Sequence, residues 1–88
     1  MATFTVRSII EGQRPILLVC HDEDGWQFLT GDAVGMHEAM IVALKTILRH
    51  DPSVSELSDL ALGWQAWRQQ PGAEWVREPR HEEGAAEQ

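Results

Sequence analysis

Cysteine, tyrosine and long apolar runs are scarce in this sequence of 88 residues, which has one cysteine, Cys20, and no tyrosine. A lone cysteine cannot form an internal disulfide, so nothing ties the chain to an oxidising compartment. Apolar runs such as Ile16 to Cys20 are far shorter than the roughly 20 residues that span a bilayer. The start, MATFTVRSII, has neither a basic leader nor a long apolar stretch. We therefore expect a cytoplasmic protein that does not enter a membrane.

Basic residues are also few. Seven Lys and Arg oppose fourteen Asp and Glu, which gives a net charge of −7 and a sequence pI near 4.9. A field of this sign repels phosphate backbones, so nucleic acid is not an expected partner. Asp22, Glu23 and Asp24 concentrate part of the acidic excess within the folded part of the chain. The charge favours a basic protein surface as the partner.

Motifs that carry chemistry are missing. Cys20 and His21 are neighbours in a predicted strand, where successive side chains point to opposite faces, so they cannot act as a thiolate and its base. The acidic run Asp22 to Asp24 does not fit a calcium loop, because placing Gly25 at the invariant glycine puts Cys20 at the first ligand position. No glycine pattern matches a dinucleotide or phosphate loop. We predict no catalytic, cofactor or metal site, and a protein that is not an enzyme.

Three segments of the N-terminal part are predicted to be strands. Alternating apolar and polar residues favour a strand over residues 3–10, and the apolar run at 16–20 is typical of a central strand. Asp24-Gly25 between two hydrophobic runs is a strong hairpin signal, so residues 26–30 should return antiparallel to 16–20. Trp26 and Phe28 then share one face. The three strands are expected to form an antiparallel meander.

A helix is predicted over about residues 36–50. Met36, Met40, Leu44 and Ile47 recur at helical spacing, and Asp51 before a proline should end the helix near residue 50. A cap at Ser53, with Glu56 three residues later, predicts a helical turn over about 54–60. Residues 64–68 are compatible with strand or helix, and an edge strand is favoured.

These elements predict one α+β domain over residues 1–78, in which a small antiparallel sheet of three to four strands packs on one main helix. Residues 79–88 are expected to be a flexible acidic tail. If the helix packs on the sheet, Leu44→Ala should cost on the order of 2–5 kcal/mol as a core truncation. The oligomeric state is not determined by the sequence.

Tryptophan, in contrast, is abundant: four residues in a chain of 88. Tryptophan suits both a small core that needs bulk and an interface anchor. Trp26 and Trp67 are expected in the core. If any tryptophan is exposed, we expect it to be Trp64 or Trp75, and with Asp22, Glu23 and Asp24 these two form the predicted interaction surface.

A series of short motifs carries a family resemblance. The motifs are HDEDGWQFL at 21–29, DPS at 51–53, ELSDL at 56–60, GWQAWR at 63–68 and PG at 71–72. In this series the chain resembles a group of small bacterial proteins of unknown function. The order of its Gly-Trp-Gln-Phe, Gly-Asp, helix and Asp-Pro segments is similar to a family regarded as immunity proteins of bacterial toxin systems. The resemblance transfers no functional residue.

The function expected from the sequence is therefore binding rather than catalysis. The first hypothesis is a non-catalytic bacterial domain that binds another protein through its acidic hairpin and exposed aromatic residues. The alternative is an immunity protein that neutralises a cognate bacterial toxin, as the looser resemblance implies.

Overall fold

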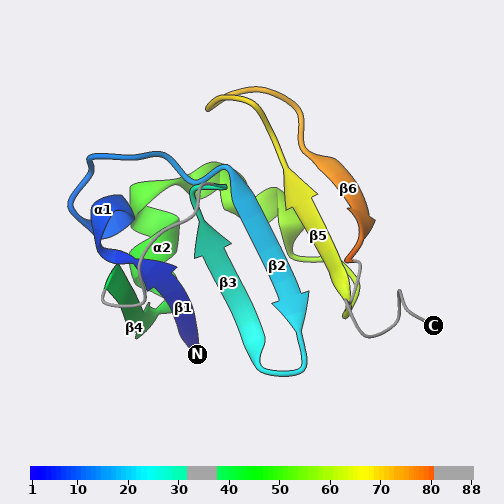
Figure 1. Cartoon of the computed structure of the whole chain (residues 1–88), viewed down its shortest axis with the longest axis horizontal. Coiled ribbons are helices and arrows are strands. Elements are labelled where there is room, and N and C mark those ends of the chain that lie inside the picture. Colours follow the sequence, from blue (N-terminus) through cyan, green and yellow to red (C-terminus); the bar gives the residue numbers. More distant parts are fainter. Residues whose placement is uncertain (32–37, 81–88) are drawn as a thin grey trace.

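Six strands form one mixed sheet in the computed structural model, which describes residues 1–31 and 38–80. The strands are β1 (Ala2–Val6), β2 (Leu18–Asp22), β3 (Gly25–Leu29), β4 (Ala39–Ala43), β5 (Trp64–Trp67) and β6 (Val76–Pro79). Their order across the sheet is β4-β1-β3-β2-β5-β6 (Figure 1). All neighbours are antiparallel except β1 and β3, which are parallel. The α+β class is confirmed, whereas the predicted sheet of three to four antiparallel strands is wrong.

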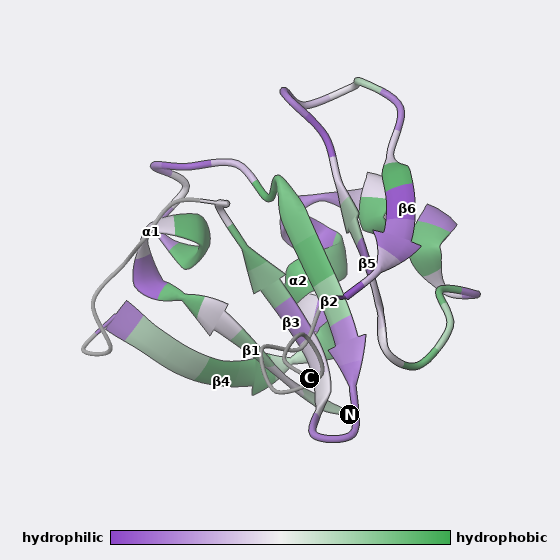
Figure 2. Cartoon of the chain, turned by 45° about the vertical axis from the view of Figure 1, so that its right-hand side comes forward, coloured by the Kyte–Doolittle hydropathy of each residue, from purple (hydrophilic) through white to green (hydrophobic). Residues whose placement is uncertain are grey.

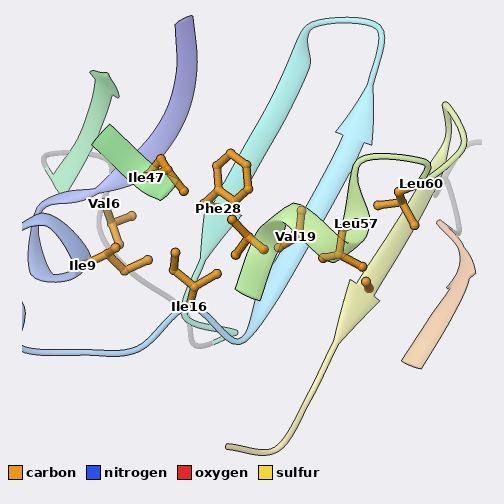
Figure 3. Packing of buried hydrophobic residues seen from close by; sticks show 10 residues of the cluster. Val6, Ile9, Ile16, Val19, Phe28, Ile47, Leu57 and Leu60 are labelled. Atoms are coloured by element: carbon orange, nitrogen blue, oxygen red, sulfur yellow. The ribbon is translucent and has the colours of Figure 1, made fainter. Parts of the chain in front are cut away.

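The helical segments are short: α1 (Arg7–Ile10), α2 (Leu44–His50) and a 3-10 helix, η2 (Pro52–Leu57). α2 and η2 lie behind the sheet in Figure 1. Figure 3 shows Ile47 of α2 and Leu57 of η2 gathered with Phe28 and Val19 of the sheet. All four side chains are at most 2% exposed. No helix within residues 1–31 and 38–80 is long and apolar enough to cross a membrane.

The predicted hairpin is confirmed. β2 and β3 pair from Leu18↔Leu29 to Asp22↔Gly25, so two residues, Glu23 and Asp24, form the turn. Gly25 closes the turn with a φ of 115°, a conformation that L-residues with a Cβ rarely adopt. Trp26 and Phe28 share a face as expected, with their rings stacked at a centroid distance of 6.3 Å.

The predicted meander is wrong because the first strand ends early. The chain leaves the sheet after Val6 and enters α1, where Ser8 and Ile9 are buried, so residues 7–10 are not strand. The segment after α1 leads to β2, and the tight hairpin then returns β3 into the place between β2 and β1. β1 therefore pairs with β3 in parallel, with Phe4 opposite Gln27. A crossover of this kind leaves no local signal in the sequence.

The helix predicted over residues 36–50 is confirmed only over its second half. Ala39–Ala43 is strand β4, which forms five residue pairs with β1, and α2 begins at Leu44. Residues 36 and 37 lie outside the described residues. Helical spacing of apolar residues does not exclude a strand in a run as apolar as Ala-Met-Ile-Val-Ala, and the free edge of β1 provides hydrogen-bond partners for it. The predicted end is confirmed, since α2 stops at His50.

The second helical segment begins earlier than predicted. η2 spans Pro52–Leu57, and its cap is Asp51, whose Oδ1 accepts from the Ser53 N–H at 3.0 Å. The predicted capping box, with Ser53 as the cap and Glu56 reaching back to it, is therefore wrong. A proline at the first helical position needs no hydrogen bond at its nitrogen, which favours the start at Pro52.

The C-terminal segment adds more strand than expected. Residues 64–67 do form a strand, but β5 is not at the edge, because β6 pairs with its outer side. β6 includes Pro79, and the Arg80 N–H donates to the Gly63 carbonyl at 2.8 Å. The folded part thus continues past the predicted boundary at residue 78. Residues 81–88 of the predicted tail lie outside the described residues.

Candidate functional site

The turn of the β2–β3 hairpin is stabilised by Asp22, the first residue of the predicted acidic cluster. Its Oδ1 accepts from the Asp24 N–H at 3.0 Å. Its Oδ2 accepts from Gln27 Nε2 at 3.1 Å and from Arg80 Nη1 at 2.7 Å. The Asp22 charge is thus paired with Arg80, and both side chains are less than a third exposed. Asp22 therefore shapes the turn rather than offering a free charge.

Glu23 and Asp24 have the opposite surroundings. They form the two-residue loop between β2 and β3, and both are exposed. Within residues 1–31 and 38–80, no Lys or Arg pairs with either carboxylate. A two-residue loop fixes the directions of both side chains, because the flanking strands are paired up to Asp22 and Gly25. Both carboxylates are thus exposed and without a basic partner in the part of the chain that the structure describes.

An exposed leucine lies beside the acidic turn. Leu62 is 60% exposed and precedes Gly63, whose N–H donates to the His21 carbonyl at 2.7 Å. Gly63 has a φ of 87°, which turns the chain into β5 at this point. The segment before β5 is thereby attached to the end of β2 on one side and, through Arg80, to the end of β6 on the other.

Together these residues line an open cleft with a volume of about 490 Å³. We call it the tip surface; its residues are Asp22, Glu23, Asp24, Leu62, Gly63 and Arg80. Asp22 and Arg80 form an ion pair and are partly buried, whereas Glu23, Asp24 and Leu62 are exposed; we call these three the rim. The predicted acidic cluster is therefore one part of a larger surface.

Trp64 lies next to the tip surface and is 37% exposed, as predicted. In the sheet it stands opposite His21 on one side and Pro79 on the other. His21 stacks on Trp26 with the ring centroids 4.0 Å apart, and its Nδ1 lies 2.8 Å from the Leu60 carbonyl oxygen. Cross-strand partners share a face, so Trp26, His21, Trp64 and Pro79 form one row across four strands. This row places Trp64 between His21 and Pro79 in the sheet.

Trp75, in contrast, is not part of this surface. It precedes Val76, which pairs with Trp67 at the opposite end of β5 from Trp64. Its ring is half-buried against the core, and the Arg68 guanidinium lies over it at 4.2 Å from the centroid. Of the two tryptophans predicted as candidates for exposure, Trp64 is the exposed one, whereas Trp75 covers a buried arginine.

Cys20 does not form a reactive pair with His21. Burial raises the pKa of the Cys20 thiol, and of the two nearby charges Arg80 opposes this shift while Asp22 adds to it. The thiol is buried, with 3% of the residue exposed. Cys20 pairs with Gln27 and His21 with Trp26, so the two side chains lie on opposite faces, as expected. In the described part of the chain, no three His, Cys, Asp or Glu residues are grouped to hold a metal ion.

Three residues of the tip surface, Leu62, Gly63 and Arg80, were not predicted from the sequence. Leu62 and Gly63 lie between the predicted helical turn and the predicted strand, and Arg80 lies in the predicted tail. Leu62 carries a weak signal, since it precedes a turn glycine and turns run over the protein surface. Nothing local identifies Arg80. Its partner Asp22 lies 58 positions earlier in the sequence, and the two residues meet only because β6 joins the sheet.

Comparisons with known proteins add no relative. No protein-family model matches the chain, and neither the curated proteins nor the solved structures include a significant match. The resemblance to small bacterial proteins and the immunity hypothesis stay predictions.

Proposed function

We propose that this protein is a non-catalytic domain that binds a basic segment of another protein at the tip surface. The observation that carries the proposal is the position of two unpaired carboxylates, Glu23 and Asp24, beside the exposed Leu62 on one rigid rim. Charged groups steer a partner and set its orientation, while an apolar contact next to them adds affinity. A partner segment with Lys or Arg beside an apolar residue matches this arrangement.

Rigidity supports the proposal. The Asp22–Arg80 ion pair and the backbone bonds of Gly63 join the ends of β2, β5 and β6 below the rim. A surface that is already ordered loses little conformational entropy when a partner binds. Trp64, which lies between His21 and Pro79 in the sheet, extends the same end of the sheet with an aromatic side chain that suits an interface.

The same geometry argues against catalysis at this cleft. Four ionisable side chains line it, which is the feature that an active site requires. Asp22 and Arg80 neutralise each other, however, and Glu23 and Asp24 stand in solvent at its rim. Acid–base chemistry depends on groups held in a site that excludes water, because there the electrostatic effects are large. An exposed rim provides binding charges without this environment.

A capture experiment tests the proposal. The tagged protein and its Glu23→Gln/Asp24→Asn variant are used to capture partners from a lysate of the native host, with Glu74→Gln as a control for an exposed acid in the β5–β6 loop. Asp22 is kept, because its change would disturb the turn. We expect a basic partner that is captured by the parent and by the control and is depleted at least about tenfold with the variant, in line with a loss of more than 1.4 kcal/mol.

Two further measurements make the result decisive. Raising the salt concentration should weaken capture by the parent, since exposed charges are screened. Leu62→Ala should weaken it at every salt concentration. Equal capture by the parent and by Glu23→Gln/Asp24→Asn, or partners that are acidic, would refute the tip surface as the binding site.

A further inference from the structure

The two edges of the sheet differ in how they are protected. β6 ends in Pro79 and carries the exposed Arg77 next to Glu78, and proline and charge are devices that prevent further strand pairing. β4 contains no charged residue and no proline: its sequence is Ala-Met-Ile-Val-Ala. Figure 2 shows β4 as a mostly hydrophobic strand at its edge of the sheet. Among the described strands, none pairs with the outer side of β4.

The backbone of β4 presents a regular set of free groups. The Leu44 N–H donates to the Met1 carbonyl at 2.8 Å, which makes these two residues a hydrogen-bonded position of the β1–β4 ladder. Bonded and non-bonded positions alternate in an antiparallel pair, so Met40 and Val42 bond to β1. The N–H and C=O groups of the other three residues, Ala39, Ile41 and Ala43, therefore point to the open side. These are the groups that an added strand would use.

The same three residues have exposed side chains. Ile41 is 66% exposed, and Phe4, which stands opposite it on β1, is 39% exposed. Ile41 and Phe4 therefore form an exposed apolar patch at an unprotected edge of the sheet. No residue in the described part of the chain covers this patch. Because Phe4 and Ile41 are a non-hydrogen-bonded pair, their side chains are close and act as one patch.

We propose that two copies of this chain associate through β4, antiparallel and with the two-fold axis at Ile41. The strand is self-complementary about this residue: alanine lies at each end, and large apolar residues fill the middle. With the axis at Ile41, Ala39 faces Ala43 of the second copy, Met40 faces Val42, and Ile41 faces itself. All five residues are then paired, and a continuous row of Phe4 and Ile41 from both copies crosses the interface.

A two-fold contact suits this strand for a second reason. The net charge of each chain is −7, so an association of two copies must avoid bringing acidic groups together. β4 has no charge of either sign, and the acidic tip surface lies on the β2–β3 hairpin, two strands away. An isologous contact uses the same patch on both copies and closes after two chains, which prevents further growth at this edge. This inference is independent of the proposed function.

Sedimentation equilibrium across a range of protein concentrations tests the association. We expect a mass that rises with concentration from 9.9 kDa, that of one chain, to twice this value. Ile41→Lys should shift the mass to that of one chain at every concentration, and Val76→Lys, the same change at an exposed apolar residue of the protected edge, should not. Far-UV circular dichroism confirms that both variants are folded, as the exposure of both positions predicts.

Cysteine crosslinking tests the register in a Cys20→Ser background. Opposite residues at a hydrogen-bonded position have Cα atoms about 5.5 Å apart, within the range of a disulfide. Ile41→Cys should therefore form a covalent dimer under mild oxidation, whereas Ala43→Cys, which faces Ala39 of the second copy, should form at least tenfold less. A single-chain mass at all concentrations, or equal crosslinking of the two variants, would overturn the proposal. The first result would instead favour a strand of a different protein as the binding partner of the β4 edge.

Discussion

Replacing Arg68 by methionine should remove a large part of the stability of the fold. Its side chain is 1% exposed and joins three separate segments of the chain. Nε and Nη2 donate to the Ile16 carbonyl at 3.2 and 3.0 Å, Nη1 donates to Ser53 Oγ at 3.0 Å, and Nη2 also pairs with Asp51. Trp75 covers the guanidinium.

The magnitude follows from what the change would leave unpaired. Removing one partner of a buried ion pair lowers the free energy of unfolding by about 3–5 kcal/mol, because the remaining charge is left buried without a partner. Asp51 keeps its bonds from Ser53 and is 21% exposed, so water reaches it and the lower part of that range applies. The Ile16 carbonyl is left without its donor, which adds about 1–3 kcal/mol. We expect a loss of about 4 kcal/mol in the free energy of unfolding, out of the roughly 5–15 kcal/mol of a typical domain.

Urea unfolding, followed by far-UV circular dichroism and tryptophan fluorescence, measures this loss. Arg77→Met is the matched control, since Arg77 pairs with Asp59 at 2.7 Å on the surface, where an ion pair contributes little. Arg68→Lys should fall between the parent and Arg68→Met, because an ammonium keeps the charge but cannot donate in two directions from a planar group. A loss below about 1 kcal/mol for Arg68→Met, the size expected of a surface pair, would refute the structural role assigned to this residue.

Four further predictions concern the core, the cysteine and the surface ion pair. Ile47→Ala, at a fully buried position, should lower the free energy of unfolding by about 2–5 kcal/mol in the same urea assay. Leu44→Ala should cost only about 1–2 kcal/mol, because Leu44 is half-buried and not a full core residue as the sequence predicted. Cys20 should react with a thiol reagent at least about tenfold more slowly in the native protein than in guanidinium chloride, since burial protects the thiol and raises its pKa. The hydrogen bond from Arg77 lowers the pKa of Asp59, so this pair stabilises the fold above the ordinary aspartate pKa and the contribution is lost as the pH falls through the lowered value. Arg77→Gln should therefore raise the Asp59 titration midpoint in an NMR pH series, and an unchanged midpoint would contradict the pairing.

The local features of the fold were predictable from the sequence. The Asp24-Gly25 step fixed the hairpin, because few residues other than glycine adopt the φ that its turn needs. Asp51 before Pro52 fixed the end of α2, because a residue before proline is driven out of helical geometry. In both cases the cause is a pair of neighbouring residues, so the feature can be predicted from the sequence alone.

The strand β4 shows why other parts were not predictable. Residues 39–43 satisfy a helical and an extended pattern equally well, and the choice depends on whether β1 has a free edge at that place. That edge is free only because α1 and the hairpin put β3 on the other side of β1. The parallel β1–β3 pairing is the cause of both errors, the meander and the long helix. A non-local event of this kind cannot be deduced from periodicity.

In the tip surface, too, the local features were predictable from the sequence and the long-range contacts were not. The sequence identified its acidic residues, because a charged two-residue turn is exposed in almost any hairpin. It could not divide them into Asp22, which Arg80 neutralises, and the free pair Glu23 and Asp24, since this division depends on β6 bringing Arg80 to the end of β2. Only the free pair can attract a cation from outside, so a change at Asp22 would test the turn and not the binding. The functional experiment must therefore leave Asp22 intact, and this design is available only once the pairing of β5 and β6 is known.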